Sequence, residues 1–321
     1  MPDSSAFELV YRRSVRTSFF LVLFLVLIGG VVRSTGAGLG CPDWPRCFGL
    51  WVPPTSIEEI PAEFWNHPLS SENGKVIFNP VKTWTEYLNR LLGVIIGFSI
   101  LIQALLSFFQ KKNRAVNWYS SLALVLVLFQ GWLGARVVSS DLRPLVISLH
   151  LLVALLIGIT LLLALFYSRE SFSSGTSAFR KSSWQNRVLF FSSLFLLIQF
   201  FLGTEVRSQV DGLFREFDFS SRELYAGRLD WKFLIHRSFS LLTFALLFVQ
   251  FRICSKQFEP QLIWVPALPL LLSVLLILSG VVLVYLGFPA FAQPFHLLFG
   301  FSVVCSECWL VLRLCFSKKA A

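Results

Sequence analysis

Three of the four histidines of this 321-residue chain fall in the first turns of long apolar segments, where an imidazole can ligate a metal. They are His150, His236 and His296. Ionisable side chains at membrane depth are costly and usually face the interior of a helix bundle, where cofactor and metal sites are built. Two imidazoles from opposed helices can ligate a haem iron axially, which we expect for His236 and His296. The alternative is that each imidazole only forms hydrogen bonds at the membrane interface.

A repeated motif places Asn89 where a partner for His150 would be expected. The stretch 84–90 reads Trp, four residues, Asn and Arg, and the stretch 231–237 reads Trp, four residues, His and Arg. An amide oxygen is a poor ligand for haem iron. A haem in the first half would therefore be ligated by His150 alone, or with an unidentified group, and one axial position would stay open.

Glu86 lies three residues before Asn89 and therefore on the same face of a helix. Its counterpart in the second copy of the motif is Phe233, so the carboxylate occurs in one copy only. We interpret Glu86 as a catalytic group that handles protons or stabilises a cation beside a reacting cofactor. The alternative is a bond with Arg90, four residues further along the same helix.

Five arginines lie near one set of segment ends and are candidates for binding anionic groups. Guanidinium groups form charge-assisted, often bidentate bonds with carboxylates, which suits the propionates of a haem. The alternative is that these side chains extend to lipid headgroups or water. The five are Arg33, Arg90, Arg136, Arg207 and Arg237.

Two cysteine pairs have different interpretations. Cys41 and Cys47 flank a stretch with two prolines, which favours a tight, bent loop. On an oxidising face of a membrane this pair can close a small disulfide, and the alternative is a pair of free thiols. Cys305 and Cys308 lie on one face of an apolar segment, and we interpret them as packing residues.

The composition is that of a membrane protein. Hydrophobic residues make up 55% of the chain and charged residues 14%, whereas soluble domains are about 45–50% apolar and about a quarter charged. The net charge of +10 is explained by Lys and Arg in cytoplasmic loops, because no basic run interleaves with aromatic residues away from a membrane flank. We therefore expect membrane lipid, and no nucleic acid, as a partner.

Eight segments are apolar over about 20 residues, the length that a helix needs to cross the hydrocarbon core. Backbone polar groups inside the bilayer must be satisfied within each segment, so all eight are predicted to be helices. The sequence thus predicts an all-α polytopic membrane protein. The predicted spans are 16–33, 86–109, 116–138, 145–167, 187–207, 232–253, 261–285 and 293–315.

Short basic connections fall on one side of these spans, which the positive-inside rule makes cytoplasmic. Both termini are then cytoplasmic, and the helix ends that carry the three histidines point to the outer face. Basic residues at 12–16 precede the first span without a following cleavage site, so we expect it to be retained as a helix. The longest outer loop, 34–85, contains His67, which we interpret as an ordinary loop residue.

The two halves of the chain are similar to each other. The stretch 29–34 resembles 203–208, and Gln130-Gly131 resembles Ser279-Gly280. Parallel repeats of this kind place sites inside each half. We therefore predict two pseudo-symmetric four-helix bundles. The predicted N-terminal half is 1–167, including the outer loop 34–85, and the C-terminal half is 168–321.

Several motifs, taken in this order, resemble the haem A synthase family, membrane enzymes of bacteria and mitochondria that oxidise haem O. The most specific is GGVVRSTGAGLGCPDWP at 29–45. The resemblance continues through EYLNRLLG at 86–93 and QGWLGA at 130–135. It includes the three histidines of the apolar segments and so spans nearly the whole chain.

This resemblance implies that haem O is oxidised at a ring methyl to a formyl, giving haem A for cytochrome oxidase. It implies a haem b in the second half, held by His236 and His296, that relays electrons. It also implies a substrate haem O in the first half, near Glu86, Asn89 and His150.

The same resemblance assigns further roles. Glu86 matches the family's catalytic glutamate, and Cys41 and Cys47 match a loop disulfide found in many members. The implied setting is the bacterial inner membrane. The implied partners are a haem O synthase, the cytochrome oxidase assembly pathway and an electron donor within the membrane.

Asn89 departs from the family pattern, which usually has His at this position. The retained Glu86 favours the same reaction carried out with one axial histidine. One alternative is a non-catalytic relative that carries or senses haem. The other is a quinol-linked, cytochrome b-type protein that transfers electrons.

Overall fold

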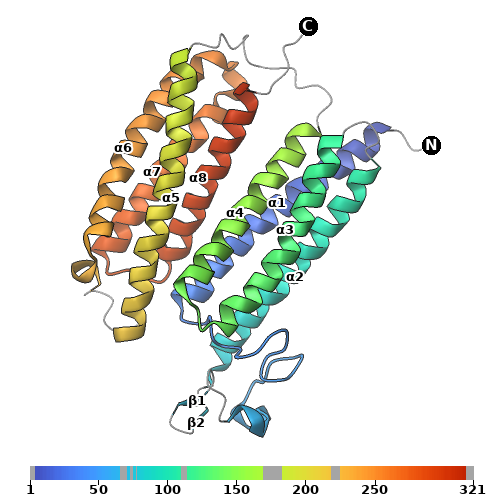
Figure 1. The fold of residues 1–321 in the computed structure, drawn as a ribbon, viewed down its shortest axis with the longest axis vertical. Coiled ribbons are helices and arrows are strands. Elements are labelled where there is room, and N and C mark those ends of the chain that lie inside the picture. Colours follow the sequence, from blue (N-terminus) through green and yellow to red (C-terminus); the bar gives the residue numbers. More distant parts are fainter. Residues whose placement is uncertain are drawn as a thin grey trace. The chain divides into compact units, whose positions relative to one another are not determined.

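The computed structural model describes residues 4–65, 71–72, 75–76, 78–109, 114–168, 183–217 and 225–315. Eight long α-helices account for most of these residues (Figure 1). Two short strands, β1 (Ser71–Glu72) and β2 (Lys75–Val76), pair antiparallel in the first loop. Apart from this small hairpin, the described part of the chain is all-α. His67 lies outside the described residues.

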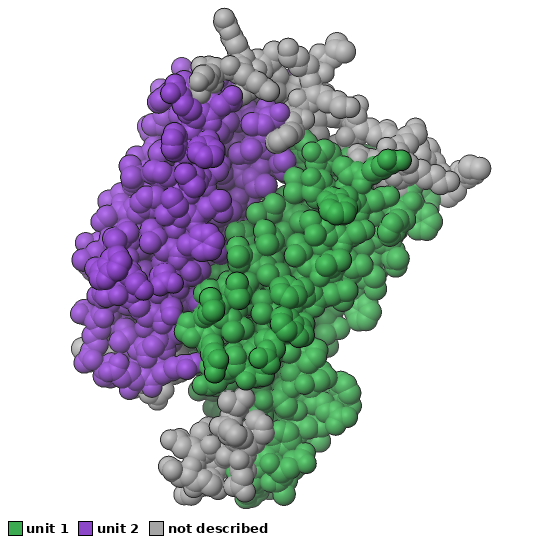
Figure 2. All heavy atoms as spheres, viewed as in Figure 1, with its two compact units in different colours: residues 1–168 green, residues 169–321 purple. Residues whose placement is uncertain are grey.

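The chain divides into two compact units, Met1–Ser168 and Arg169–Ala321, which Figure 2 colours separately. The helices of unit 1 are α1 (Ser4–Ser34), α2 (Pro80–Phe108), α3 (Arg114–Ser139) and α4 (Pro144–Tyr167). Those of unit 2 are α5 (Ser183–Phe217), α6 (Trp231–Cys254), α7 (Trp264–Tyr285) and α8 (Ala292–Cys315). Single 3₁₀ turns lie at Ile57–Glu59, Ala62–Phe64, Ala226–Arg228, Ser255–Gln257 and Pro260–Leu262.

All eight helices are long and apolar enough to cross a membrane, which confirms the eight predicted spans. Some helices are longer than the apolar segments within them. Helix α1 begins at Ser4 and α5 continues to Phe217, beyond the predicted bounds of 16 and 207. Hydropathy marks only the part of a helix that crosses hydrocarbon. The extension of α5 is supported instead by an ion pair at 3.0 Å between Arg207 and Asp211, one turn apart.

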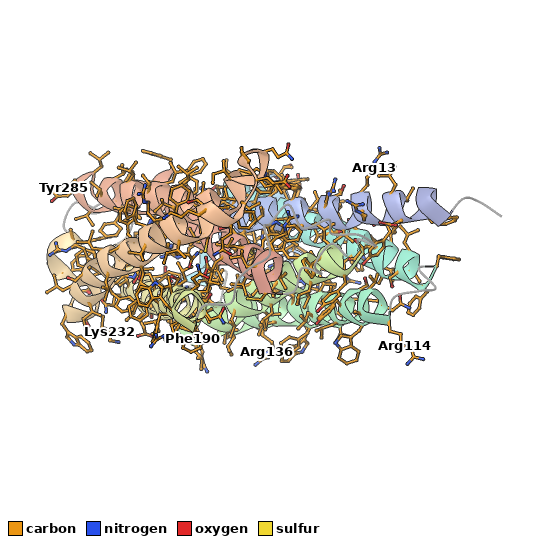
Figure 3. All side chains as sticks on the ribbon, turned by 90° about the horizontal axis from the view of Figure 1, so that it is seen from above. Arg13, Arg114, Arg136, Phe190, Lys232 and Tyr285 are labelled. Atoms are coloured by element: carbon orange, nitrogen blue, oxygen red, sulfur yellow. A yellow bond between two sulfur atoms is a disulfide. The ribbon has the colours of Figure 1, made fainter. Side chains whose placement is uncertain are left out.

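Large apolar side chains cover the outside of both units. Phe190 is 62% exposed and Tyr285 is 81% exposed, and both lie at the periphery of the helices (Figure 3). Extended apolar surface of this kind is unfavourable in water. On helices of this length it is expected where lipid tails surround the bundle.

Each unit is a closed ring of four helices. In unit 1, α1 and α3 each pack against both α2 and α4. In unit 2, α5 and α7 each pack against both α6 and α8. Side chains that project into such a ring can meet across it, which is how helix bundles build internal sites. The neighbour order is the same in both units, and a symmetry relation between them stays a prediction.

Capping residues determine where two of the helices begin. Asn79 accepts the backbone N–H of Lys82 at 3.1 Å, just before the proline that starts α2. Asp230 accepts the backbone N–H of Lys232 at 2.8 Å at the start of α6. Side-chain oxygens at these positions satisfy N–H groups that the first turn leaves without a partner. The two caps therefore fix where α2 and α6 begin, and this fixes how far along each helix residues 89 and 236 lie.

Candidate functional site

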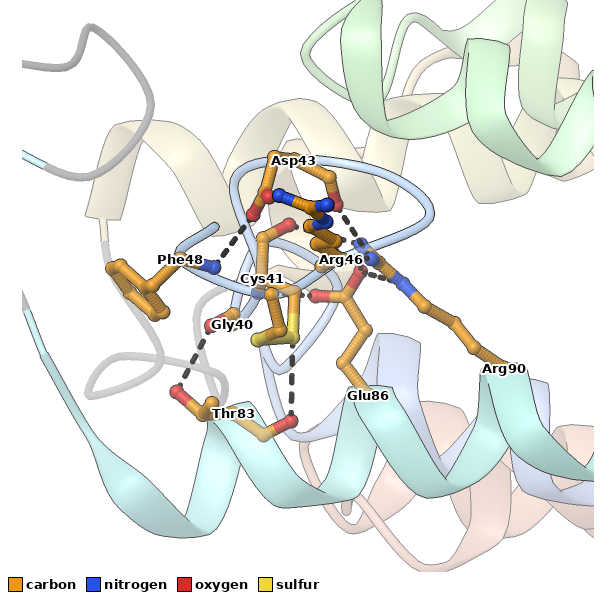
Figure 4. Close-up of polar contacts among 9 residues, drawn as sticks. Gly40, Cys41, Asp43, Arg46, Phe48, Thr83, Glu86 and Arg90 are labelled. Carbon is orange, nitrogen blue, oxygen red and sulfur yellow. Dashed lines mark hydrogen bonds and ion pairs between the residues drawn. A yellow bond between two sulfur atoms is a disulfide. The ribbon is translucent and has the colours of Figure 1, made fainter. Parts of the chain in front are cut away.

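Glu86 joins α2 to the first loop (Figure 4). Its side chain is buried, and Oε2 accepts the backbone N–H of Cys41 at 2.9 Å. Its Oε1 accepts Nε and Nη2 of Arg90. Charge-assisted bonds to both oxygens hold the carboxylate in one orientation. The alternative interpretation of Glu86, a bond with Arg90, is thus confirmed, and its catalytic role stays a prediction.

All five N–H donors of Arg90 form hydrogen bonds, with Glu86 and with carbonyl oxygens of the first loop. Besides Glu86, it donates through Nη1 to the carbonyl oxygens of Asp43 at 2.6 Å and Arg46 at 3.1 Å. Its Nη2 also donates to the carbonyl oxygen of Cys41 at 2.9 Å. A guanidinium has five N–H donors and no acceptor. In this arrangement Arg90 binds the loop and has no donor left for a propionate.

A disulfide between Cys41 and Cys47 closes this part of the loop, which confirms the predicted pair. The chain then turns through Phe48 and Gly49, whose φ angles are 53° and 74°. Positive φ at both central residues is the geometry of a type I′ turn. The carboxylate of Asp43 accepts the N–H groups of both turn residues, at 2.6 and 2.9 Å. The loop is therefore held by its own bonds as well as by Arg90.

Gly40 lets the loop lie directly against the first turns of α2. A Cβ at this position would be 2.5 Å from the carbonyl oxygen of Lys82, which is backbone and cannot easily give way. The carbonyl oxygen of Gly40 accepts the hydroxyl of Thr83 at 2.9 Å. This close approach brings the N–H of Cys41 within reach of Glu86.

The distal part of the loop is ordered by local hydrogen bonds. Glu59 accepts the backbone N–H of Thr55 at 2.9 Å and its hydroxyl at 2.8 Å. These bonds, the backbone one first, lower the pKa of the exposed Glu59 carboxyl. The hydroxyl of Tyr87, on α2, donates to the carbonyl oxygen of Trp51 at 2.6 Å. The loop thus remains tied to α2 beyond the disulfide.

His236 and His296 lie between the helices of unit 2 and are close enough to interact electrostatically. A glycine on the preceding helix of the chain backs each ring. A Cβ at Gly203 would be 3.3 Å from Cε1 of His236, and a Cβ at Gly280 would be 3.3 Å from Cε1 of His296. The small residues on α5 and α7 therefore make room for the imidazoles of α6 and α8.

Hydrogen bonds at Nδ1 orient both rings. Ser279 donates its hydroxyl to the carbonyl oxygen of Leu276, and its Oγ lies 2.9 Å from Nδ1 of His296. That hydroxyl oxygen is then an acceptor for Nδ1–H, which leaves Nε2 of His296 as a metal-binding nitrogen. Gln199 Nε2 lies 3.1 Å from both Nδ1 and the carbonyl oxygen of His236. Sequence reasoning missed Gln199 as a partner of this ring.

His150 in unit 1 has a glycine beside it but a different polar environment. A Cβ at Gly134 would be 3.4 Å from Cε1 of His150. In the described part of the chain, His150 Nδ1 and Asn89 Oδ1 are buried atoms without a hydrogen-bond partner. Most buried polar atoms in native proteins are paired, so each exception needs an explanation such as a bound group.

The glycine positions correct the alignment of the two halves. The sequence comparison pairs Gln130-Gly131 with Ser279-Gly280, whereas the structure places Gly134 against His150 as Gly280 is placed against His296. Both glycines precede their histidine by sixteen residues, a spacing that could have been found in the sequence. Gln130 instead donates to the carbonyl oxygen of His150 at 3.0 Å.

Two of the remaining arginines have contacts that the structure defines. Arg207 pairs with Asp211, as described above, and the guanidinium of Arg237 lies 5.8 Å from the ring centroid of Phe233. Arg237 and Phe233 occupy the places that Arg90 and Glu86 have in α2. Propionate binding by any of these arginines, or by Arg33, stays a prediction.

Arg136 lines a small cavity at the end of α3. The cavity measures about 220 Å³ and is lined on its other side by the first loop. Ligand pockets typically measure about 300–1,000 Å³, so this one is too small for a porphyrin. Its lining residues are Pro42, Asp43, Trp44, Ala135, Arg136, Val138 and Ser139.

Eight spans in two four-helix units, with histidines set between helices by glycines, define a polytopic membrane protein built from helix bundles. Residues 12–307 match the sequence model of a family described as cytochrome oxidase assembly protein (COX15-CtaA). The chain belongs to this family, which confirms the resemblance drawn from the motifs.

Individual relatives are similar over different lengths. A protein of Bacillus pumilus named Heme A synthase is 29% identical over 95% of this chain and 96% of its own length. Proteins of the same name from Shewanella oneidensis and Orientia tsutsugamushi strain Boryong are 32% and 31% identical, over 43% and 53% of this chain. In these two cases the match spans only 39% and 50% of the relative.

Proposed function

We propose that this protein is a haem A synthase, an oxidoreductase that converts haem O to haem A by oxidising a ring methyl to a formyl. The observation that carries the proposal is the pair of imidazoles from His236 and His296, each backed by a glycine, with Nε2 of His296 left available by the Ser279 hydroxyl. Membership of the family and the full-length similarity to a protein named Heme A synthase support the reaction.

His236 and His296 would hold a haem b. In the described ranges, no three His, Cys, Asp or Glu side chains converge to hold a bare metal ion. Two imidazoles suit an iron whose other ligands come from a porphyrin. The hydroxyl of Ser279 supports this assignment, because it leaves Nε2 of His296 available. The bound haem b would supply single-electron transfer between a membrane donor and unit 1.

Haem O would bind in unit 1 as the substrate, with His150 as its axial ligand. Gly29 matches Gly203 in the repeat, but a Cβ at Gly29 would meet nothing within 4 Å. Leu25 stands where Gln199 would be in the same alignment. At these two aligned positions, which the structure describes, unit 1 therefore has Asn89 in place of the second imidazole and Leu25 in place of the amide that orients it. This supports an open axial position on the substrate iron.

We assign Glu86 as the catalytic carboxylate, which would stabilise positive charge or move a proton as the methyl is oxidised. Its fixed orientation supports this role, because catalytic groups act best when they are held in place before the reaction. Arg90 would hold Glu86 and the loop in position. Arg33, Arg207 and Arg237 would bind haem propionates.

The proposed location is the bacterial inner membrane, with both termini cytoplasmic and the haem-binding helix ends toward the outer face. The Cys41–Cys47 disulfide supports this orientation, since disulfides persist mainly outside the cytoplasm. The proposed partners are a haem O synthase, the cytochrome oxidase assembly pathway and a membrane electron donor such as a quinol.

Co-expression with a haem O synthase, followed by extraction and chromatography of the haems, tests the proposed reaction. We expect haem A from the wild-type protein and little or none from Glu86→Ala. If the wild type yields only haem O and haem B, the enzyme assignment is wrong. That result, with a normal bis-histidine spectrum, would favour the alternative of a non-catalytic haem-binding or quinol-linked cytochrome b-type protein.

A further inference from the structure

A second polar cluster lies inside unit 2, away from the histidines. Glu307, on α8, is 3% exposed. Its Oε1 accepts the hydroxyl of Ser193 on α5 at 3.1 Å, and its Oε2 accepts Nε2 of Gln250 on α6 at 2.7 Å. Both donors are uncharged. An ionisable side chain at membrane depth is costly and calls for a functional explanation.

The cluster lies on the same helix faces as the two candidate ligands. Glu307 is eleven residues after His296, and Gln250 is fourteen residues after His236. At about 3.6 residues per turn these separations are close to three and four full turns, so each pair shares one face of its helix. Glu307 is then about 16 Å from His296 along the axis of α8. Helices α6 and α8, which carry the two imidazoles, are therefore also joined by the hydrogen bond between Gln250 and Glu307.

Gln250, which bonds Glu307, and Ser192, which precedes Ser193 in the sequence, each have a buried oxygen with hydrogen-bonding capacity to spare. Gln250 is 1% exposed and Ser192 is fully buried. Gln250 Oε1 and Ser192 Oγ have no hydrogen-bond partner among the residues that the structure describes. Such oxygens can accept a bond from a protonated carboxyl or from a water that delivers a proton.

In the described part of unit 1, the equivalent position has no acid. Gln103 occupies the place in α2 that Gln250 has in α6, and it donates to the hydroxyl of Ser120 at 2.8 Å. The position equivalent to Glu307 is Leu161, a fully buried residue. The carboxyl group is thus found in the unit that carries two facing imidazoles, and an apolar side chain replaces it in the unit that carries one.

Few other titratable groups face Glu307. The thiols of Cys254 on α6 and Cys308 on α8 interact with it electrostatically. Helix α5 contributes the hydroxyl of Ser193, and α7 has no ionisable side chain before Tyr285. Thiols are neutral at acidic and neutral pH. In that range Glu307 is the group of this cluster that changes charge.

We propose that Glu307, held by Gln250 and Ser193, is a proton-binding site whose occupancy follows the redox state of the centre at His236 and His296. This inference rests on the proposed haem b. When that centre gains one electron from the membrane donor, the protonated fraction of Glu307 rises, and each molecule that takes up a proton from the aqueous phase forms one O–H bond. Oxidation reverses both steps. At about 16 Å and an effective dielectric constant of about 20, the coupling changes proton affinity roughly fivefold.

Redox titration of the bis-histidine haem at several acidic and neutral pH values tests this site. The wild-type midpoint potential is expected to fall as pH rises, and Glu307→Gln is expected to flatten that dependence while keeping the absorption spectrum. Glu259→Gln, at an exposed acid of unit 2, is the matched control and should keep the wild-type slope. An unchanged slope in Glu307→Gln with an intact spectrum overturns the proton site but leaves the proposed function standing.

A second measurement covers the case in which Glu307→Gln fails to fold. The redox-induced infrared difference spectrum of the wild type should contain a band of a protonated carboxyl that Glu307→Asp shifts. A wild-type protein that shows neither this band nor proton uptake on reduction by dithionite overturns the proposal without any variant. Absence of the bis-histidine signal from the wild type would overturn the haem b assignment and the proton site together.

Discussion

Glu86 and Arg90 are one helical turn apart on α2, and together they bind the backbone of a loop that lies more than forty residues earlier in the chain. Glu86 accepts the N–H of Cys41, and Arg90 donates to the carbonyl oxygen of the same residue. The two side chains thus bind both backbone polar groups of Cys41, in the disulfide loop. Any role of Glu86 in catalysis depends on this arrangement.

Replacing Glu86 by alanine should destabilise unit 1. The change leaves the guanidinium of Arg90 largely buried without its partner, which typically costs about 3–5 kcal/mol. Chemical denaturation in detergent, followed by tryptophan fluorescence, measures the loss. Glu63→Gln, at an exposed loop acid, should change stability by no more than about 0.5 kcal/mol. Equal stability of Glu86→Ala and the wild type would contradict the structural role of the pair.

Breaking the Cys41–Cys47 disulfide should loosen the loop and lower the yield of haem A. The bridge closes a short segment with a sequence separation of 6, for which the loop-entropy model gives about 2 kcal/mol. Limited proteolysis of Cys41→Ser should cut the loop faster than in the wild type. Cys308→Ser, at a cysteine outside any disulfide, is the control. Unchanged proteolysis would mean that Arg90 and Asp43 suffice to hold the loop.

Gly203→Ala should disturb the haem b spectrum, whereas Gly212→Ala on the same helix should not. A Cβ at Gly203 would be 3.3 Å from the His236 ring, so the imidazole must move by a few tenths of an ångström. A Cβ at Gly212 meets nothing within 4 Å. We expect reduced haem b content or a changed low-spin signal in the first variant only, measured by absorption and electron paramagnetic resonance. Two identical spectra would argue against His236 as an oriented ligand.

His236→Ala should remove the low-spin bis-histidine signal, because one of the two axial nitrogens is lost. Absorption and electron paramagnetic resonance spectra of the purified variant measure this loss. His67→Ala, at the histidine of the outer loop, is the comparison and should retain the signal. Survival of the low-spin signal in His236→Ala would refute the assignment of haem b to unit 2.

Asn89→His should convert a haem bound in unit 1 to a six-coordinate, low-spin form. The substitution supplies a second imidazole opposite His150, and the open space beside Gly29 can receive it. Carbon monoxide binding to the reduced protein gives an independent readout, and it should be present in the wild type and weaker in the variant. If neither property changes, residue 89 does not face the substrate iron.

The number of spans and the candidate ligands could be predicted from the amino-acid sequence. Apolar runs of about 20 residues identify membrane helices reliably, because the bilayer forces each segment to satisfy its own backbone. Histidines are so rare in such segments that His150, His236 and His296 stood out by position alone. The family motifs at 29–45 and 86–93 could also be read directly.

The contacts of each side chain, in contrast, depend on how the helices and loops pack in three dimensions. Hydropathy carries no information on the extension of α5 beyond its apolar segment, where Arg207 and Asp211 form an ion pair. The partners of Glu86 come from a loop whose path is set by a turn and a disulfide, and both depend on contacts distant in sequence. The role proposed for Glu307 could not be predicted from the sequence for the same reason. That role depends on hydrogen bonds from Gln250 and Ser193, which lie on two other helices of the bundle.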